Sequence, residues 1–291
     1  MKVVRTKDDL RAALEPLRDA DGTLGLVPTM GALHEGHLSL LRAARERCDA
    51  VVMTLFVNPA QFAPGDDLDA YPRDEARDLE LAEAEGVDLV YAPASAEVYP
   101  PGFATTVEVG GGLTDVLCGD PAQRGPGHFR GVTTVVAKLL NQVGADVAYF
   151  GQKDVQQALV IKRMADDLDF STRIEVLPTV REPDGLAMSS RNAYLSEDER
   201  TRAGALSRAL RKAEEAAAAG GTSTRAALEV ASAELAAAGI EPEYLEARDA
   251  ADLSPARSFN GRPVLVAVAA RVGDARLIDN VLIGAEPPRL D

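Results

Sequence analysis

The sequence of 291 residues lacks tryptophan and has only two cysteines and three histidines. Cys48 and Cys118 form no CxxC pair, and two thiols in a chain of this length do not indicate a disulfide framework. No apolar run approaches the roughly 18 residues that a membrane span requires, and MKVVRTKDDL has no long apolar stretch after its basic residues. We therefore expect a cytoplasmic protein with inert structural thiols and no membrane partner.

Basic residues are also scarce. The formal net charge is -15, from 31 Lys and Arg against 46 Asp and Glu, and the chain has no run rich in Lys or Arg. This balance argues against nucleic acid as a partner. An anionic ligand would need a local cluster of positive groups, helped by helix N-termini and backbone amides.

The residues that are present predict a folded protein of two domains, because 46% are hydrophobic and 26% charged. In the first half, β-rich runs with little polar alternation are separated by helical patterns. This favours a Rossmann-like, doubly wound α/β domain with a parallel sheet covered on both faces. The expected strands are 24–28, 50–57, 87–92, 147–150 and 173–178, and the expected helices are 37–48, one from about 72, 133–142 and 155–167.

The pattern changes beyond residue 180. Two Ala-rich helices are expected at 196–219 and 222–238, followed by strands at 244–247, 264–270 and 276–283. Gly273 and Asp274 predict a hairpin between the last two strands, and the lack of a sustained heptad favours packed surface helices over a coiled coil. We predict a first domain of residues 1–179 and a smaller α+β domain of residues 180–291.

The most distinctive segment is PTMGALHEGH, residues 28–37, between the first predicted strand and the first predicted helix. In an open parallel sheet, ligands bind at the carboxyl ends of strands, and Gly31 and Gly36 permit close backbone approach near a helix N-terminus. His34 and His37 are three residues apart, so on a helix both can point at one phosphate group. The segment predicts a nucleotide site.

The same segment allows other interpretations. A zinc HExxH motif needs a second histidine at position 38, where this chain has Leu38. His34, His37 and His128, which are all the histidines, could still form a catalytic zinc site, or the pair could merely cap a helix. The chain has neither a GxGxxG fingerprint nor a GxxxxGK[ST] loop, so a dinucleotide dehydrogenase or a P-loop kinase is not supported.

Two further strings follow predicted strands. FVNPAQF, residues 56–62, places the amides of Asn58 and Gln61 where they could bind a hydroxyl or carboxylate, although Asn58 and Pro59 also suit an ordinary turn. In FGQKDVQQ, residues 150–157, Lys153 offers a charge for phosphate and Asp154 a carboxylate for a ribose hydroxyl or magnesium. A plain helix start is the alternative for this string.

A fourth string, VREPDGLAMSSRN at residues 180–192, falls at the predicted domain boundary. Ser189, Ser190 and Arg191 bring two hydroxyls and a fixed cation into a glycine-containing segment, and such a loop can close on a triphosphate. An exposed linker is the alternative. Together the four strings lie at strand ends or at the domain boundary, so we expect the fold to bring them into one cleft.

These strings resemble those of the pantothenate synthetase family, which belongs to the nucleotidyltransferase superfamily with its paired-histidine HxGH-type motif. The resemblance runs from about Gly25 to Ile283, and its most specific pieces are PTMGALHEGH, FVNPAQF, FGQKDVQQ and PTVREPDGLAMSSRNAYL. It implies ATP-dependent ligation of pantoate and β-alanine to pantothenate, through a pantoyl adenylate and with Mg²⁺. It also implies a Rossmann-like domain with a C-terminal lid, and a homodimer.

The resemblance also implies site residues. His34, His37, Lys153 and Arg191 would be catalytic, with the histidines on the phosphates and His37 the proton donor. The ATP site would comprise Met30, Gly31, Ala32, Leu33, His34, Glu35, Gly36, His37, Gly151, Gln152, Lys153, Asp154, Val180, Met188, Ser189, Ser190 and Arg191. Substrate would contact Asn58, Gln61, Tyr71, His128, Val135, Val136 and Gln157.

The chain departs from the family at one place. The family commonly has Arg-Pro-x-His-Phe, whereas here the run is Arg124, Gly125, Pro126, Gly127, His128, Phe129. The arginine is displaced by one residue, so only His128 is carried over as a site residue.

Overall fold

The computed structural model describes residues 1–18, 22–63, 68–259 and 261–284. The chain forms two compact units. The first comprises Met1–Gly110, Arg124–Gly151 and Gln157–Leu177, and the second comprises Gly111–Gln123, Gln152–Gln156 and the chain from Pro178 onward.

The first unit is built on a six-stranded sheet in the order β1-β4-β3-β2-β5-β6. Every neighbouring pair is parallel. The strands are β1 (Lys2–Val4), β2 (Leu24–Thr29), β3 (Ala50–Leu55), β4 (Leu89–Tyr91), β5 (Val147–Gly151) and β6 (Arg173–Leu177). The central strands are buried almost throughout, which explains why they read as continuous apolar runs in the sequence.

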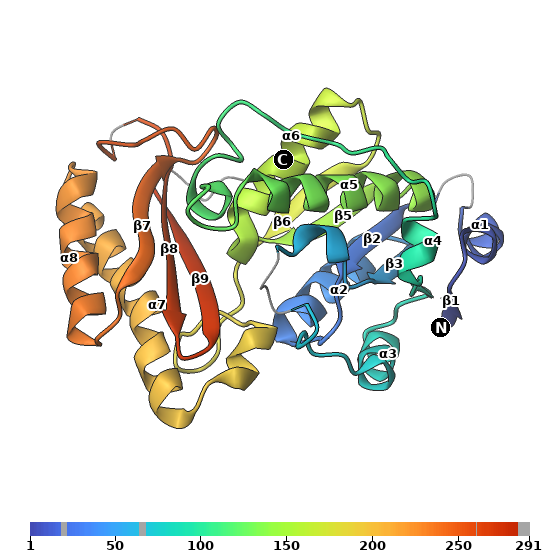
Figure 1. Ribbon diagram of the computed structural model, residues 1–291, viewed down its shortest axis with the longest axis horizontal. Helices are drawn as coiled ribbons and strands as arrows, with labels where there is room; N and C mark the ends of the chain where they lie inside the picture. The colour runs from blue at the N-terminus through green and yellow to red at the C-terminus, as the bar shows by residue number, and fades with distance from the viewer. Residues whose placement is uncertain (19–21, 64–67, 260, 285–291) are drawn as a thin grey trace. The chain divides into compact units, whose positions relative to one another are not determined.

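Helices cover both faces of this sheet (Figure 1). They are α1 (Lys7–Leu14), α2 (Glu35–Arg47), α3 (Glu75–Ala84), α4 (Ser95–Val98), α5 (Pro126–Val143) and α6 (Val155–Asp167). Apolar residues of α2 and α3 form one core cluster with β2, β3, β4 and β5. Right-handed crossovers place α5 and α6 on the opposite face, because the strand order runs one way from β2 to β3 and the other way from β5 to β6. The order therefore reverses between β2 and β5, where open α/β sheets bind ligands beyond the strand ends.

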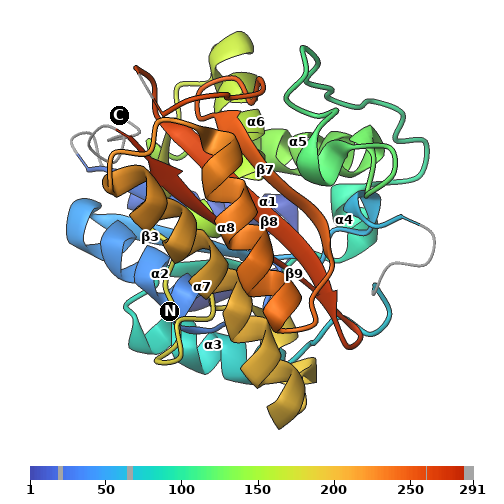
Figure 2. The ribbon, with the colours of Figure 1, turned by 90° about the vertical axis from the view of Figure 1, so that its left-hand side faces the viewer.

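The second unit contains an antiparallel sheet of β7 (Pro242–Asp249), β8 (Val264–Val272) and β9 (Ala275–Ile283). Figure 2 shows α7 (Glu197–Ala218) and α8 (Thr224–Ala237) side by side over one face of this sheet. Alanines such as Ala209, Ala213 and Ala231 are fully buried in the core they share with the strands. Their small side chains let the helices approach each other and the sheet closely.

The predicted fold class is confirmed, with a doubly wound parallel sheet and a small C-terminal α+β unit. The hairpin at Gly273 and Asp274 is also confirmed, because β8 pairs with β9 across these two residues. Among the α-helices and strands, β1, α1 and α4 were missed, and the largest boundary error lies at the start of α5. Helix α5 begins at Pro126 rather than near 133, because Gly125 has a positive φ of 70° as the N-cap and Pro126 suits the first helical position.

The domain boundary predicted after residue 179 stays a prediction. The structure adds that Gly111–Gln123 and Gln152–Gln156 pack with the second unit, although both precede that boundary. Within the part of the chain that the structure describes, no helix combines the length and the apolar character needed to cross a bilayer.

Candidate functional site

The loop after β2 makes a sharp turn before α2 begins. Gly31 and Ala32 have positive φ angles of 83° and 52°, and the second of these is unusual for a residue with a Cβ. The Asp78 carboxylate accepts hydrogen bonds from the backbone amides of Ala32, at 2.9 Å, and Leu33, at 2.7 Å. The loop that carries the paired histidines is therefore held by a carboxylate from α3.

Both histidines cap the first turn of α2. His34 is the N-cap residue, and its Nδ1 accepts from the amide of Gly36 at 3.1 Å. His37 lies three residues on, and its Nδ1 accepts from the amide of His34 at 3.4 Å. The two ring centroids are 4.1 Å apart. The sequence-based expectation that the two rings share one helix face is confirmed.

This capping arrangement has a chemical consequence. Because each Nδ1 accepts a backbone hydrogen bond, the proton of the neutral imidazole must be on Nε2. Each ring is thus an Nε2–H donor beside the positive end of the α2 dipole, where anions are stabilised. The arrangement both caps the helix and suits phosphate binding, so the helix-cap alternative and the nucleotide hypothesis are compatible.

Asn58 anchors the turn Pro59–Gln61 that follows β3. It is 1% exposed. Its Nδ2 donates to the carbonyl of Gly131 at 3.1 Å and to Oε1 of Gln61 at 3.0 Å. Its Oδ1 accepts from the amide of Ala60 at 3.3 Å and from the hydroxyl of Tyr99 at 2.7 Å. All four hydrogen-bonding positions of the amide are used within the protein, so Asn58 holds Gln61 in place.

Gln61 lies against the histidine loop and against α5. Its Nε2 is 3.3 Å from Sδ of Met30. A Cβ at Gly131 would lie 2.2 Å from the carbonyl oxygen of Ala60, so only glycine at this position of α5 lets the turn approach the helix. Gly131 and Tyr99 were missed by the sequence analysis, because nothing local in the sequence marks them as neighbours of Gln61.

His128 and Arg124 lie together at the start of α5. Nδ1 of His128 is 2.8 Å from the carbonyl oxygen of Gln61, which can only accept, so this nitrogen carries the proton. Nη1 of Arg124 is 3.4 Å from the same ring nitrogen. Despite its displacement by one residue, the arginine reaches His128, because Gly125 turns the chain with its positive φ.

The other residues expected to contact substrate in this unit differ in burial. Tyr71 is 6% exposed and packs edge to face on Phe62, with ring centroids 6.2 Å apart. Val135 and Val136 are each 5% exposed on α5. Gln157, on α6, is partly buried. A Cβ at Gly151, the last residue of β5, would meet no protein atom within 4 Å, in keeping with backbone approach by a ligand.

In the second unit, β9 holds the segment that contains Lys153. The buried side chain of Asn280 donates from Nδ2 to the carbonyls of Gln152, at 2.9 Å, and Lys153, at 3.0 Å. Nε2 of Gln152 returns a hydrogen bond to Oδ1 of Asn280 at 3.3 Å. Nζ of Lys153 is 3.2 Å from Oδ2 of Asp154.

Asp279, the residue before Asn280, anchors the string of residues 180–192, which contains Ser189, Ser190 and Arg191. Asp279 accepts from Nη1 of Arg181 at 2.6 Å and from Nη2 at 3.0 Å. Burial raises the pKa of this carboxyl, and the Arg181 guanidinium opposes that rise. Two adjacent residues of one strand thus hold both predicted ATP-binding strings of this unit, and neither residue had been marked by the sequence analysis.

The segment of residues 180–192 folds back so that its two halves pair with each other. Arg181 forms an isolated β-bridge with Ala187, and the amide of Met188 donates to the carbonyl of Val180 at 3.0 Å. The hydroxyl oxygen of Ser189 accepts from the amide of Arg191 at 3.3 Å, where the 3₁₀ turn Ser190–Tyr194 begins. Nδ2 of Asn192 donates to the Glu182 carboxylate and to the carbonyl of Ala187. The linker alternative therefore fails, since the segment is an ordered turn.

No group of three His, Cys, Asp or Glu side chains suited to a metal ion occurs within the described residues. The three-histidine zinc interpretation is therefore wrong, because His34, His37 and His128 do not come together in such a group. Magnesium differs, since it retains several waters and is bound by one or two carboxylates together with substrate phosphates. Asp154, with a side chain 46% exposed, fits that requirement.

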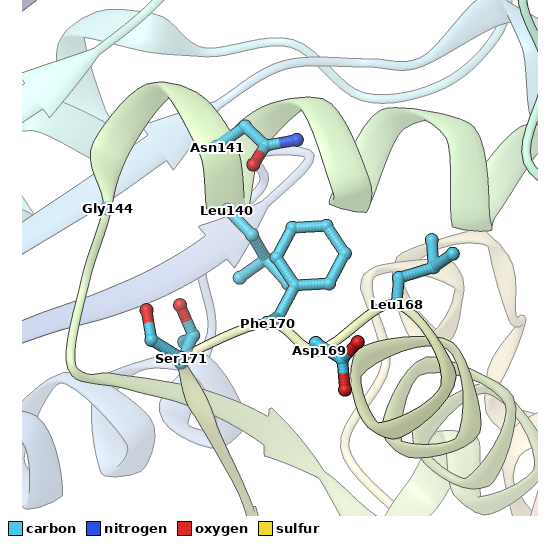
Figure 3. Close-up of a pocket in the computed structure, with 8 residues that line it drawn as sticks. Leu140, Asn141, Gly144, Leu168, Asp169, Phe170 and Ser171 are labelled. Carbon is cyan, nitrogen blue, oxygen red and sulfur yellow. The ribbon is translucent and has the colours of Figure 1, made fainter.

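A separate hollow of about 390 Å³ lies where α5 and α6 end, next to the start of β6. Figure 3 shows Phe170 beside Leu140, with Asp169 and Ser171 on the turn that leads into β6. Its lining contains no basic side chain, and it faces the amino end of β6 rather than the strand ends that carry the histidine loop. It does not suit a phosphate.

The comparison with known families is decisive. A sequence model of the pantoate-beta-alanine ligase family matches residues 2–282. This chain belongs to that family. The predicted resemblance is confirmed, and with it the ligase class.

Individual relatives agree over nearly full lengths. Pantothenate synthetase from Novosphingobium aromaticivorans is 52% identical over 98% of this chain and 100% of its own. The crystal structure of the Thermus thermophilus pantothenate synthetase matches with a TM-score of 0.92 at 45% identity, covering 98% of this chain and 100% of that one. Pantoate-beta-alanine ligase from Francisella tularensis, solved with beta-gamma ATP and β-alanine, matches with a TM-score of 0.80 at 30% identity and 97% coverage of both.

Proposed function

We propose that this chain joins pantoate to β-alanine with consumption of ATP, through a pantoyl adenylate, and releases AMP and pyrophosphate. The observation that carries the proposal is the imidazole cap of α2, where two Nε2–H donors stand at a helix N-terminus beside the switch point of the sheet. Membership of the pantoate-beta-alanine ligase family supplies the substrates. The ATP and β-alanine complex of the Francisella tularensis relative supports the choice of nucleotide and amine.

The first step must convert the pantoate carboxylate into an acylating agent, because a carboxylate and an amine do not condense at neutral pH. The carboxylate attacks the α-phosphorus of ATP, and pyrophosphate leaves. His34 and His37 donate to phosphoryl oxygens on which negative charge grows, while Lys153 and Arg191 offset charge on the departing pyrophosphate. A bound magnesium ion, with Asp154 as the protein ligand in reach, would supply further charge neutralisation.

In the second step the amine of β-alanine attacks the adenylate carbonyl and AMP leaves. Gln61 is the central substrate residue in this proposal, because Asn58 and His128 fix it through its side chain and its backbone carbonyl. We propose that Tyr71, Val135, Val136 and Gln157 complete the pantoate site, and that Asn58 contributes through Gln61. Polar groups arranged in this way reject analogues that lack the pantoate hydroxyl, because a buried donor would be left unpaired.

The family motifs support the remaining ATP contacts that we propose. These contacts are Met30 to His37, Gly151 to Asp154, Val180 and Met188 to Arg191. A homodimer and a cytoplasmic location are proposed on the same ground. Sedimentation equilibrium tests the dimer, which requires a mass of twice the 30.8 kDa of one chain.

The experiment that tests the function measures AMP and pyrophosphate release from ATP and Mg²⁺, first with pantoate alone and then with β-alanine added. We expect steady turnover only with both substrates. His37→Ala should reduce turnover about a hundredfold to a thousandfold, because one aimed donor contributes roughly 2.7 to 4 kcal/mol to the transition state. Arg47→Ala, at the other end of α2 and paired with Glu175, is the matched control and should retain activity.

If β-alanine makes no difference to turnover, the chain is a nucleotidyltransferase that stops at adenylation. If ATP binds without turnover, the chain is a binding protein. Either result removes the ligase assignment.

A further inference from the structure

Asp78 is a buried carboxylate whose place in the molecule is unexpected from its sequence context. It belongs to α3, a helix rich in acidic residues that face solvent, yet it is only 2% exposed. No ion pair with a basic side chain is found for it within the described residues. Its partners are two backbone amides of the histidine loop, at 2.9 Å and 2.7 Å.

The loop is shaped to receive this carboxylate. Successive amides that follow residues with positive φ form a concave site for an anion, and here Ala32 and Leu33 provide them. A Cβ at Gly31 would lie 2.8 Å from Oδ2 of Asp78 and 2.8 Å from Cδ1 of Leu55, so glycine gives the carboxylate its room. The anion site in the turn is therefore filled by the protein itself.

The two amides directly precede the helix cap. Leu33 is followed by His34, which is the N-cap, and the capping box ties His34 to His37. A shift of the turn therefore shifts both imidazoles together. We propose that Asp78 is a positioning residue that sets the height and direction of the His34–His37 pair, acting through the backbone of Ala32 and Leu33. This inference rests on the proposed function, since it gives Asp78 a part in adenylate formation.

Kinetic measurements distinguish a positioning role of Asp78 from a merely structural one. Asp78→Asn keeps the size of the side chain but has one acceptor oxygen, and its NH₂ group would face one of the two amides. We expect kcat for pyrophosphate release to fall roughly tenfold to a hundredfold, the scale of a misplaced catalytic group. KM for pantoate should stay close to the wild-type value, because Gln61 is held by Asn58 and His128 rather than by Asp78.

A matched control lies at the opposite end of β2. Asp146 also accepts from a backbone amide, that of Leu24, at 2.7 Å between Oδ2 and the amide nitrogen. Asp146→Asn thus disturbs the same strand away from the histidines, and it should leave kcat unchanged. Gly31→Ala approaches the same contact from the other side and should reproduce the kinetic defect of Asp78→Asn.

The deciding measurement is a double-mutant cycle with His37→Ala. If Asp78 acts through the imidazoles, its loss should lower kcat by a smaller factor in the His37→Ala background than in the wild type, because only His34 is left to be misplaced. Multiplied losses, an equal loss in Asp146→Asn, or unfolding of both Asp78→Asn and Gly31→Ala would overturn the proposal. Failure of the wild-type chain to make pantothenate would overturn the proposed function instead.

Discussion

The three histidines of this chain hold their protons in two different ways. His34 and His37 accept backbone hydrogen bonds at Nδ1, whereas His128 faces a carbonyl oxygen with Nδ1. In a protein with many imidazoles this difference would be hard to observe. Here it is accessible because no other histidine is present.

Nitrogen-15 NMR of histidine-labelled protein should therefore show two tautomers above the titration range of imidazole. We expect His34 and His37 as Nε2–H and His128 as Nδ1–H, because a carbonyl cannot donate to a ring nitrogen. Single variants at each position assign the signals. If His34 or His37 shows Nδ1–H, the capping geometry is wrong in solution.

At the scale of elements, two consecutive residues of β9 bind two segments of the chain, one at Gln152 and Lys153 and the other at Arg181. Asp279 is paired with Arg181, and Asn280 bonds to the carbonyls of Gln152 and Lys153. Both residues are 3% exposed. The strand therefore does more than complete the small sheet, because it binds the backbone at Gln152 and Lys153 and the side chain of Arg181.

Removing the cation of this pair should be costly. Arg181→Met leaves the Asp279 carboxyl buried without its guanidinium, and we expect the free energy of unfolding of this unit to fall by about 3 to 5 kcal/mol. Denaturant titration measures it. Arg163→Ala, which breaks an exposed pair with Asp167 one helical turn away, should change stability by less than about 1 kcal/mol.

A second substitution, at Asp279, tests whether the buried charge is the cause of this destabilisation. Burial is the main cause that raises the pKa of the Asp279 carboxyl. Replacing this carboxyl with a neutral amide should therefore reduce the free-energy cost of burying it without the Arg181 guanidinium. Arg181→Met combined with Asp279→Asn should therefore recover part of the stability lost in Arg181→Met. If the double variant is less stable than the single, burial of the charge is not the cause.

Much of the architecture could be predicted, because periodic signals are local. Helix α6 was predicted with the observed bounds, and the apolar runs of β2, β3 and β5 announced a covered parallel sheet. The start of α5 could not be predicted, since Gly-Pro-Gly is as typical of a loop as of a helix start. The short β1 gave too few residues for a pattern.

The site was predictable where the chain repeats a family motif and unpredictable where it depends on distant partners. His34, His37, Lys153 and Arg191 stand in recognisable strings, and their catalytic roles stay predictions. Asp78 lies 46 residues beyond Ala32 in sequence, and Asn280 lies 128 residues beyond Gln152. Only the folded chain shows that these acids and amides hold the motifs in place.

At the scale of the whole molecule, buried and partly buried tyrosines connect stability to alkaline pH. Burial raises the pKa of Tyr91 and of Tyr99 to about 12, and it raises the pKa of Tyr244 and Tyr149 as well. The hydroxyl of Tyr99 must keep its proton to donate to Asn58. Folding therefore favours the neutral phenols.

Stability should be independent of these groups below about pH 10, the pKa of an unfolded tyrosine, and should fall as pH rises from there toward about 12. The unfolded chain releases its phenolic protons first, which fixes the sign. Unfolding midpoints measured at steps from pH 8 to about pH 12 test this. Tyr99→Phe should flatten the fall, and a midpoint that rises in this window would contradict the assignment.

The way the chain passes between the two units limits how it can be divided. It leaves the first unit for Gly111–Gln123, returns, leaves again for Gln152–Gln156, returns, and departs finally at Pro178. A recombinant fragment ending at Leu177 would carry two orphaned pieces, including the apolar side chains of Leu113 and Leu117 and the amide of Gln156, which bonds to the carbonyls of Leu113 and Val116. The complementary fragment would lack the backbone that Asn280 binds. Expressing the halves separately would therefore yield two incomplete proteins. A split version must either carry Gly111–Gln123 and Gln152–Gln156 on the second fragment or have its two fragments co-expressed.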